Sequence, residues 1–442
     1  MPPARCVPAV KSRLPGTSST PPAPLSVKPT TTALDLGSEL LDQVMQFSTP
    51  ADAVLSAFFR RHPALGRAER AWMADGVYAV LRHFYTLERL LGSTAPRRLL
   101  LAAAWLKFGG MSLRELEAAI TPEEAAALAP LKATVLEGLP LSIAAELPPW
   151  VIEALQADMA DDAILALGRA LQNPAPLDAR VNTLKARRED VLARLHAEGV
   201  AAQATPYSPW GVRLPHGFPL HRHSLFLDGS LEVQDEGSQL ITFLLAPRRG
   251  EKVVDLCAGA GGKTLALGAQ MAGNGRIYAL DTNAKRLAQL GPRLARAGLA
   301  NVTPQVIAPE NDVRLKRLAG KIDRVLVDAP CSGLGTLRRN PDLKFRQSPT
   351  AVAELNRKQA ALIRAGARLL RPGGRLVYAT CSLLPAENQA IVADFLAEQP
   401  AFKRIPAATL LPDPALDEHG DMFLSPARHG SDGFYAAALQ AP

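Results

Sequence analysis

Two cysteines follow apolar segments that are typical of buried strands. Cys331 stands in Asp328-Ala-Pro-Cys-Ser332 after residues 322–327, and Cys381 stands in Thr380-Cys-Ser382 after residues 375–379. Apolar segments rich in β-branched residues are typical of parallel sheets, and ligands bind at the carboxyl edge of such sheets. Each of these two thiols is therefore a candidate nucleophile. A single buried cysteine usually only fills space in the core, but two cysteines at matching strand ends favour a catalytic role.

A glycine-rich turn precedes both cysteines. The segment 252–256 runs into Cys257-Ala258-Gly259-Ala260-Gly261-Gly262-Lys263, where glycines let the backbone approach a ligand and offer amide N–H groups. Asp281 ends the next strand, where an acid either binds ribose hydroxyls or caps the following helix. The spacing is not GxGxxG and no second nucleotide half follows, which favours a single adenosine ligand such as S-adenosyl-L-methionine. Residues 310–312, after the third strand, offer an acid or amide for the adenine amino group.

A thiol beside a methyl donor suits methylation of cytosine at carbon 5. That carbon is too weak a nucleophile until a thiolate adds at carbon 6, which splits one hard step into easier ones. A base then removes the proton from carbon 5 and the thiol leaves. Asp328 is placed to stabilise the adduct near ring nitrogen 3. The base has to be unstacked or single-stranded to reach such a site.

Alternating strands and helices position these residues. Strands are predicted at 252–256, 276–280, 302–307, 323–327 and 375–379, and helices at 263–271, 283–297, 350–370 and 387–398. This alternation indicates a parallel sheet covered on both faces. For such a doubly wound sheet we take the strand order 3-2-1-4-5. That order makes the strands before Cys331 and Cys381 neighbours. Residues 433–439 are expected to add a last edge strand.

The first part of the chain has a helical pattern. Apolar residues recur at spacings of three and four in 39–47, 51–59, 67–91 and 97–108, which predicts an all-helical bundle with Trp72 and Trp105 in its core. Ser112 and Glu115 form a capping-box pattern. A small α/β region follows, with strands at 178–185, 200–204 and 211–214. Its basic residues predict either a nucleic-acid surface or a solvated face; they are Arg180, Lys185, Arg187 and Arg188.

Composition limits the class of protein. The 442 residues are 48% hydrophobic and carry a net charge of +8, which suits a multidomain protein with a polyanionic partner. The four cysteines show no CxxC or zinc spacing, so no metal is expected, and their scarcity favours a reducing, cytoplasmic location. No segment is long and apolar enough for a membrane span. We expect a monomer with a disordered tail (1–32, with Cys6), a helical domain (33–148), an α/β linker (149–245) and a catalytic domain (246–442).

The motifs resemble those of the NOL1/NOP2/Sun family of RNA cytosine-5 methyltransferases, and in particular its bacterial RsmB-like members. The matching stretches are Asp255–Thr264, Asp328–Ser332 with Arg338–Asp342, and Tyr378–Ser382 with Glu387-Asn388; Arg180–Lys185 and Gln234–Gln239 also match. Residues 69–82 resemble the NusB-like RNA-binding domain of that branch. The resemblance implies a multidomain fold: an N-terminal all-α NusB-like bundle, a small α/β linker and a C-terminal α/β Rossmann-like class I methyltransferase.

The resemblance also assigns roles at the site. It makes Cys381 the nucleophile and gives Cys331 a part in product release, and it implies that S-adenosyl-L-methionine binds at 257–263, Asp281, Asp312 and Asp328. The implied substrate is ribosomal RNA; a transfer-RNA methyltransferase or a non-catalytic ribosome-assembly factor are the alternatives. The chain departs from the family pattern at two places. The family usually has proline at the position of Ala260, and it usually has Gly-Asp where this chain has Pro309-Glu-Asn-Asp312 after the third strand.

Overall fold

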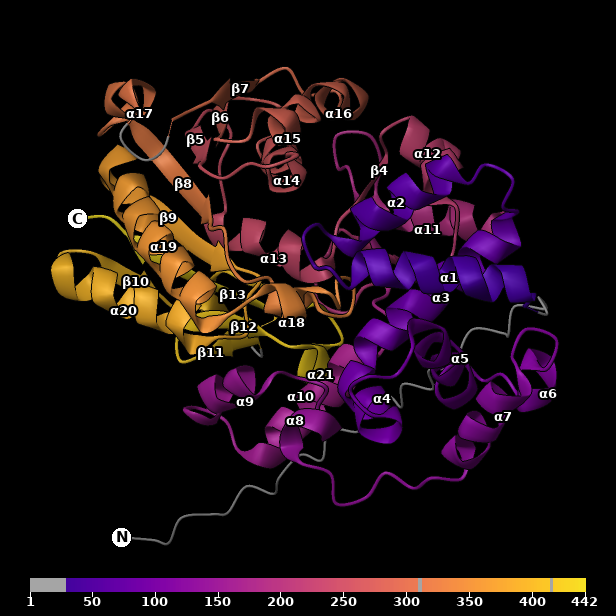
Figure 1. Ribbon diagram of the computed structural model, residues 1–442. Coiled ribbons are helices and arrows are strands. Elements are labelled where there is room, and N and C mark those ends of the chain that lie inside the picture. The colour runs from indigo at the N-terminus through magenta and orange to yellow at the C-terminus, as the bar shows by residue number, and fades with distance from the viewer. Residues whose placement is uncertain (1–28, 309–311, 414–415) are drawn as a thin grey trace, which may run out of the picture.

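The computed structural model describes residues 29–308, 312–413 and 416–442 (Figure 1). Most of the predicted tail, including Cys6, lies outside these residues, as do Glu310 and Asn311. The first helix, α1 (Thr31–Val44), begins earlier than its apolar pattern predicts. The reason is a cap: the side chain of Thr30 accepts a hydrogen bond from the amide of Ala33.

A mixed sheet forms the centre of the second half of the chain. In spatial order its strands are β11 (Asp417–Glu418), β12 (Asp421–Leu424), β13 (Phe434–Gln440), β9 (Leu370–Thr380), β8 (Ile322–Asp328), β5 (Lys252–Asp255), β6 (Arg276–Asp281) and β7 (Val302–Val306), with β10 (Lys403–Ile405) paired to β13. The strands from β9 to β7 are parallel and have the predicted order 3-2-1-4-5. The carboxyl ends of β8 and β9, which precede the two cysteines, are therefore adjacent.

The last strand corrects one prediction. Residues 433–439 are not an edge strand, because β13 lies antiparallel to β9 on one side and pairs with β12 and β10 on the other. The small side chains of Ala436, Ala437 and Ala438 are buried in this position. A fully paired, apolar strand has no free edge to protect.

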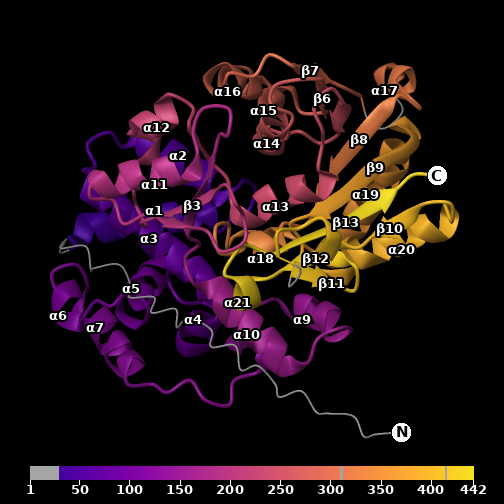
Figure 2. The same cartoon turned by 180° about the vertical axis from the view of Figure 1, so that it is seen from behind.

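Helices cover both faces of the sheet (Figures 1 and 2). On one face α19 (Pro349–Leu369) and α20 (Gln389–Glu398) bury Ile363 and Phe395. On the other face α13 (Glu236–Leu245) and α14 (Gly262–Gln270) bury Leu244 and Leu267. The predicted helix over 283–297 is broken into α15 (Ala284–Ala288) and α16 (Leu290–Ala297). Pro292 accounts for the break, since it lacks the N–H that would bond to residue 288.

A second, four-stranded antiparallel sheet lies in the middle of the chain. Its order is β2 (Gln203–Ala204), β3 (Gly211–Leu214), β1 (Leu177–Val181) and β4 (Leu231–Val233). The helices of this region are α9 (Pro149–Gln156), α10 (Asp161–Gln172), α11 (Arg188–Ala197) and α12 (Ser224–Leu227). Strand β4 and helix α12 were not predicted, because three or four residues carry too little periodicity to be recognised.

The N-terminal part is helical, as predicted. Its helices after α1 are α2 (Ala51–Arg61), α3 (Arg67–Arg82), α4 (Phe84–Leu91), α5 (Arg97–Lys107), α6 (Leu113–Leu116), α7 (Pro122–Leu128) and α8 (Leu141–Ala144). The rings of Trp72 and Trp105 stack in the core with centroids 5.4 Å apart, and the capping box of Ser112 and Glu115 is formed. The helix predicted over 67–91 is interrupted at His83, whose ring stacks on Phe108.

The helical part and the large sheet meet around two short helices. Figures 1 and 2 both place α18 (Leu343–Arg346) and α21 (Pro426–His429) between them. No helix among the described residues combines the length and apolar character needed to cross a membrane.

Candidate active site

The turn between β5 and α14 is shaped by two glycines. Gly259 and Gly261 have φ angles of 55° and 85°, which other residues rarely adopt. A Cβ atom on Gly261 would also lie 2.2 Å from Cδ1 of Leu290, so packing closes the turn to larger residues. The amides of the first turn of α14 have no acceptor within that helix. The turn therefore offers hydrogen-bond donors at the carboxyl edge of the sheet, as the sequence predicts.

Asp281 ties the second strand to this turn. Its Oδ2 accepts from the amide of Gly259 at 2.7 Å, and its Oδ1 accepts from the amide of Asn283 at 2.7 Å. The cap of α15 is Asn283, so Asp281 is not the helix N-cap that the sequence left open as an alternative. Asp312, in contrast, caps α17 (Val313–Leu318) through the amide of Arg314.

A second acid, Asp255, lies buried under the turn. Its Oδ2 accepts from the hydroxyl of Thr264 at 2.6 Å, and its Oδ1 is buried without a hydrogen-bond partner among the described residues. Burial raises the pKa of Asp255 to about 7, with the negative charge of Asp328 adding to the effect. The site therefore holds an unused acceptor beside the glycine-rich turn.

Lys263 and Asp328 join the turn to the strand that carries the first cysteine. The Nζ atom of Lys263 donates to Oδ2 of Asp328 at 2.7 Å and lies over the ring of Phe434. Burial opposes the charge on Lys263, but Asp328 outweighs it, so the net pKa of the ammonium is raised. Cys381 also interacts electrostatically with this ammonium. The cofactor side and the thiol side of the predicted site thus meet at Lys263.

The two thiols lie together. The Sγ atoms of Cys331 and Cys381 are 3.3 Å apart, and the amide of Cys381 donates to Sγ of Cys331 at 3.3 Å. Both cysteines are half-buried and free. The hydrogen bond with Cys381, burial, and the negative charges nearby all raise the pKa of Cys331. The structure therefore brings together the two residues that the strand-end argument predicts.

A buried network behind the thiols was not predicted. Glu387, in the 3-10 turn Pro385–Glu387, is 0% exposed and accepts from the hydroxyls of Ser332 and Ser382. These serines directly follow Cys331 and Cys381. The repeated Cys-Ser dipeptide at the two strand ends is the signal in the sequence that points to a shared partner.

The basic residues of the middle region do not form one surface. Arg180 is only 2% exposed and donates to Gln234, so its predicted place on an exposed basic face is wrong. Alternation along β1 turns Arg180 away from the core of its own sheet and toward the rest of the protein. The ammonium of Lys185 donates to backbone carbonyls of Asp228 and Arg296. Arg187 does have an exposed side chain.

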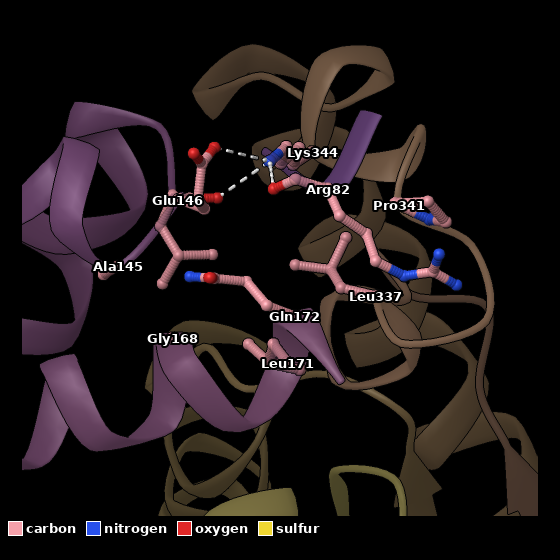
Figure 3. A pocket seen from close by; sticks show the side chains of 10 residues that line it. Arg82, Ala145, Glu146, Gly168, Leu171, Gln172, Leu337, Pro341 and Lys344 are labelled. Carbon is pink, nitrogen blue, oxygen red and sulfur yellow. Dashed lines mark hydrogen bonds and ion pairs between the residues drawn. The ribbon is translucent and has the colours of Figure 1, made fainter. Parts of the chain in front are cut away.

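The loop after Cys331 is anchored in the N-terminal helices. Figure 3 shows the ammonium of Lys344 directed at Glu146 and Arg82; it donates to both backbone carbonyls at 3.0 and 3.1 Å. Lys344 and Glu146 are both nearly fully buried, and burial lowers the pKa of Lys344 to about 8. The adjoining cavity is about 10 Å³, too small for a substrate. Phe345 stacks on Phe47 at 4.8 Å. The helices therefore hold the polypeptide that leads from Cys331.

The residues around the turn fit S-adenosyl-L-methionine. The left-handed glycines shape a tight turn whose amides face the sheet edge, Asp281 places a carboxylate at the end of the second strand, and Asp255 has an orphaned oxygen. Ala260 stands where the related family usually has proline, and its carbonyl accepts from Arg293. This hydrogen bond restrains the turn at the position where a proline ring would otherwise restrain it. No cluster of three or more potential metal ligands occurs in the described part of the chain.

The fold and the site define a Rossmann-like methyltransferase. Comparison with known proteins agrees with this class. Residues 242–440 match a family model described as 16S rRNA methyltransferase RsmB/F, and residues 147–221 match the ferredoxin-like domain of RsmF/B-like methyltransferases. Both matched segments therefore belong to the RsmB/F family. The second match covers β1 to β3 and corresponds to the predicted α/β linker.

Individual relatives are similar over large parts of the chain. A probable ribosomal RNA small subunit methyltransferase B of Synechocystis is 33% identical over 299 residues; the alignment covers 66% of each chain, just under two thirds of that relative. The crystal structure of PH0851 is 26% identical and covers 93% of this chain and 99% of its own, with a TM-score of 0.75. NSun6 from Pyrococcus horikoshii, solved with SFG, is 21% identical, with a TM-score of 0.58 over 66% of this chain and 98% of its own, and shares the fold.

Proposed function

We propose that this protein transfers a methyl group from S-adenosyl-L-methionine to carbon 5 of a cytosine in 16S ribosomal RNA. The observation that carries the proposal is the pair of thiols 3.3 Å apart at the carboxyl edge of β8 and β9. The family match and the similarity to a probable ribosomal RNA small subunit methyltransferase B support ribosomal RNA as the substrate. One chain supplies both thiols, the glycine-rich turn and the acids, so the proposed site is complete in a monomer. A ribosomal RNA substrate would place the protein in the cytoplasm.

The proposed chemistry begins with the thiolate of Cys381. It adds to carbon 6 of the cytosine, forms a C–S bond and makes carbon 5 nucleophilic. Bound S-adenosyl-L-methionine would supply the electrophilic methyl group for that carbon, its sulfur keeping the electron pair of the broken S–C bond and leaving as the neutral thioether S-adenosyl-L-homocysteine. A base then takes the proton from carbon 5, the double bond between carbons 5 and 6 reforms, and the thiolate of Cys381 leaves. Cys331 serves this release in the proposal, because its sulfur is in contact with that of Cys381.

Charged residues flank the proposed adduct. Asp328 lies beside ring nitrogen 3 of the cytosine in this proposal, and Lys263, 2.7 Å from its carboxylate, balances its charge. Cys257 to Lys263, Asp281 and Asp312 hold the methyl donor. Carboxylates at such positions suit a cofactor that carries positive charge on sulfur and nitrogen.

The remaining parts of the chain present the RNA in this proposal. We assign residues 33–148 as a NusB-like RNA-binding domain, residues 149–245 as the linker that holds the RNA strand, and residues 246–442 as the catalytic domain. Lys344 and Phe345 support that division of labour, because they fix the loop after Cys331 to the helical part. A cytosine flipped into the site would then meet a thiol pair held by both parts of the protein.

Bisulfite mapping of total RNA tests the proposal. One cytosine of 16S ribosomal RNA should resist conversion in cells with the gene and convert in cells without it. The wild-type gene should restore the resistance, and a Cys381→Ala gene should not. A change confined to transfer RNA would replace the substrate, and no change in any RNA would overturn the activity.

A further inference from the structure

One buried carboxylate is bonded to the residues that follow both thiols. Oε1 of Glu387 accepts from the amide of Ser332 at 2.8 Å, and Oε2 accepts from the hydroxyl of Ser332 at 2.5 Å. The hydroxyl of Ser382 also donates to Oε2, and the two serine oxygens are 3.1 Å apart. The loops of Cys331 and Cys381 are thus connected through a single side chain.

Neighbouring amides complete the connection. Nε2 of Gln359 donates to the carbonyl of Pro330 at 2.9 Å and to Oε1 of Glu387 at 3.0 Å. Asn388 accepts from the hydroxyl of Thr380 and donates to the carbonyl of Ser382. Residues on both sides of each cysteine are therefore held, and the carboxylate of Glu387 lies at the centre of the network.

The cost of this arrangement argues for a role beyond packing. Glu387 is 0% exposed and forms no ion pair within the described ranges of the chain. A buried charge without a cation is expensive, and here four hydrogen-bond donors offset that cost. A neutral side chain would join two loops at lower cost. The network therefore supplies what a neutral group does not: a negative charge behind a pair of thiols.

We propose that Glu387 is the positioning residue that sets the two thiols against each other and keeps Cys331 protonated while Cys381 attacks. The inference rests on the proposed function for its catalytic meaning. The geometry is the shared carboxylate, which spaces the two sulfur atoms at 3.3 Å through Ser332 and Ser382.

The negative charge of Glu387 acts on Cys331. The hydrogen bond with Cys381 and burial are the main causes that raise the pKa of Cys331, and the negative charge of Glu387 adds to them. A protonated Cys331 beside an attacking thiolate avoids two adjacent negative charges, which would disfavour each other. In this account Glu387 both spaces the thiols and separates their protonation states.

The first test reads the thiols directly. Glu387→Gln keeps the shape and the link, because the serine hydroxyls can turn to accept from its amide, but it removes the charge. Alkylation of each cysteine by iodoacetamide is followed by mass spectrometry from pH 6 to 10. Cys331 should react several-fold faster at each pH than in wild type, because loss of the nearby negative charge favours its thiolate. Cys257 is the internal control, and Glu398→Gln on the exposed face of α20 is the matched control variant.

The second test separates positioning from folding. Glu387→Ala should lower kcat for RNA methylation roughly 100-fold, with the KM for RNA within about threefold, because a small misplacement of reacting groups is enough. Glu387→Gln should recover most of that loss. If Glu387→Ala does not fold, the Ser332→Ala, Ser382→Ala double variant removes both hydroxyl bonds to Glu387, leaves the bond from the amide of Ser332, and should show the same split between kcat and KM.

The outcomes decide the inference separately from the proposed function. Alkylation needs neither RNA nor methyl donor, so it reports on Glu387 even if wild-type protein methylates nothing. A Cys331 profile for Glu387→Gln that superimposes on that of wild type would overturn the role of the charge. A Glu387→Ala or double-serine variant that keeps kcat within threefold of an active wild type would overturn the positioning role.

Discussion

The sulfur atoms of Cys331 and Cys381 lie 3.3 Å apart although 50 residues separate them in the chain. The contact arises because β8 and β9 are parallel neighbours, with Asp328 opposite Ala379 in the register. Each cysteine follows its strand by one to three residues and so reaches the same edge of the sheet. Two thiols at one edge permit the division of attack and release on a single base that we propose.

Cofactor binding is expected to depend on Asp281. Asp281→Ala removes the acceptor of the Gly259 amide together with the carboxylate proposed to bind ribose hydroxyls. Hydrogen bonds to charged groups contribute about 1.5–3 kcal/mol each, so the Kd for S-adenosyl-L-methionine should rise roughly 10- to 100-fold. Isothermal titration calorimetry measures this. The control is Asp394→Asn, an exposed acid of α20; an unchanged Kd for Asp281→Ala would remove the residue from the cofactor site.

The pH dependence of stability should reveal Asp255. Its folded pKa of about 7 lies above the value near 3.8 for an unperturbed aspartate, so the folded protein holds a proton that the unfolded chain releases. The stabilising contribution is therefore complete below about pH 4 and is lost as pH rises through 7. The unfolding free energy of wild type relative to Asp255→Asn should fall by at least about 1 kcal/mol between pH 4 and 7. Urea unfolding at several pH values measures it, and a difference that does not vary with pH would contradict the buried acid.

Much of the catalytic part could be predicted from local signals. Alternating apolar strands and amphipathic helices predicted the parallel sheet, and the strand order of the doubly wound fold made the strands before Cys331 and Cys381 neighbours. The glycine-rich turn was recognisable because only glycine suits φ angles of 55° and 85°.

Other features depend on contacts between distant segments. The burial of Arg180 follows from how β1 packs on the rest of the protein, which a basic residue in a short strand does not reveal. The place of β13 between β9 and β12 depends on antiparallel pairing that leaves no trace in local periodicity. Glu387 meets Ser332 across 55 residues, so only the fold shows their contact.

The buried pair of Lys344 and Glu146, which joins the loop after Cys331 to the helical part, should contribute to stability cooperatively. Lys344→Met leaves the carboxylate of Glu146 buried without its ammonium, and breaking a buried pair from one side costs about 3–5 kcal/mol. In a double-mutant cycle with Glu146→Gln, the two losses should not add, because the second change removes the stranded charge. Calorimetric unfolding measures the loss of unfolding free energy for each single variant and for the double variant. Lys358→Met, at an exposed position of α19, is the control, and strictly additive losses would show that the two residues act independently.

The central claim is that Cys381 attacks the base and Cys331 releases it. Purified wild type, Cys331→Ala and Cys381→Ala proteins are each incubated with 16S ribosomal RNA and S-adenosyl-L-methionine labelled in its methyl group. Denaturing gels then separate free RNA from protein–RNA adducts. Cys331→Ala should accumulate a labelled, denaturant-stable adduct, wild type should give labelled free RNA, and Cys381→Ala should give neither. Methylated RNA from Cys381→Ala, or no adduct with Cys331→Ala, would contradict the account.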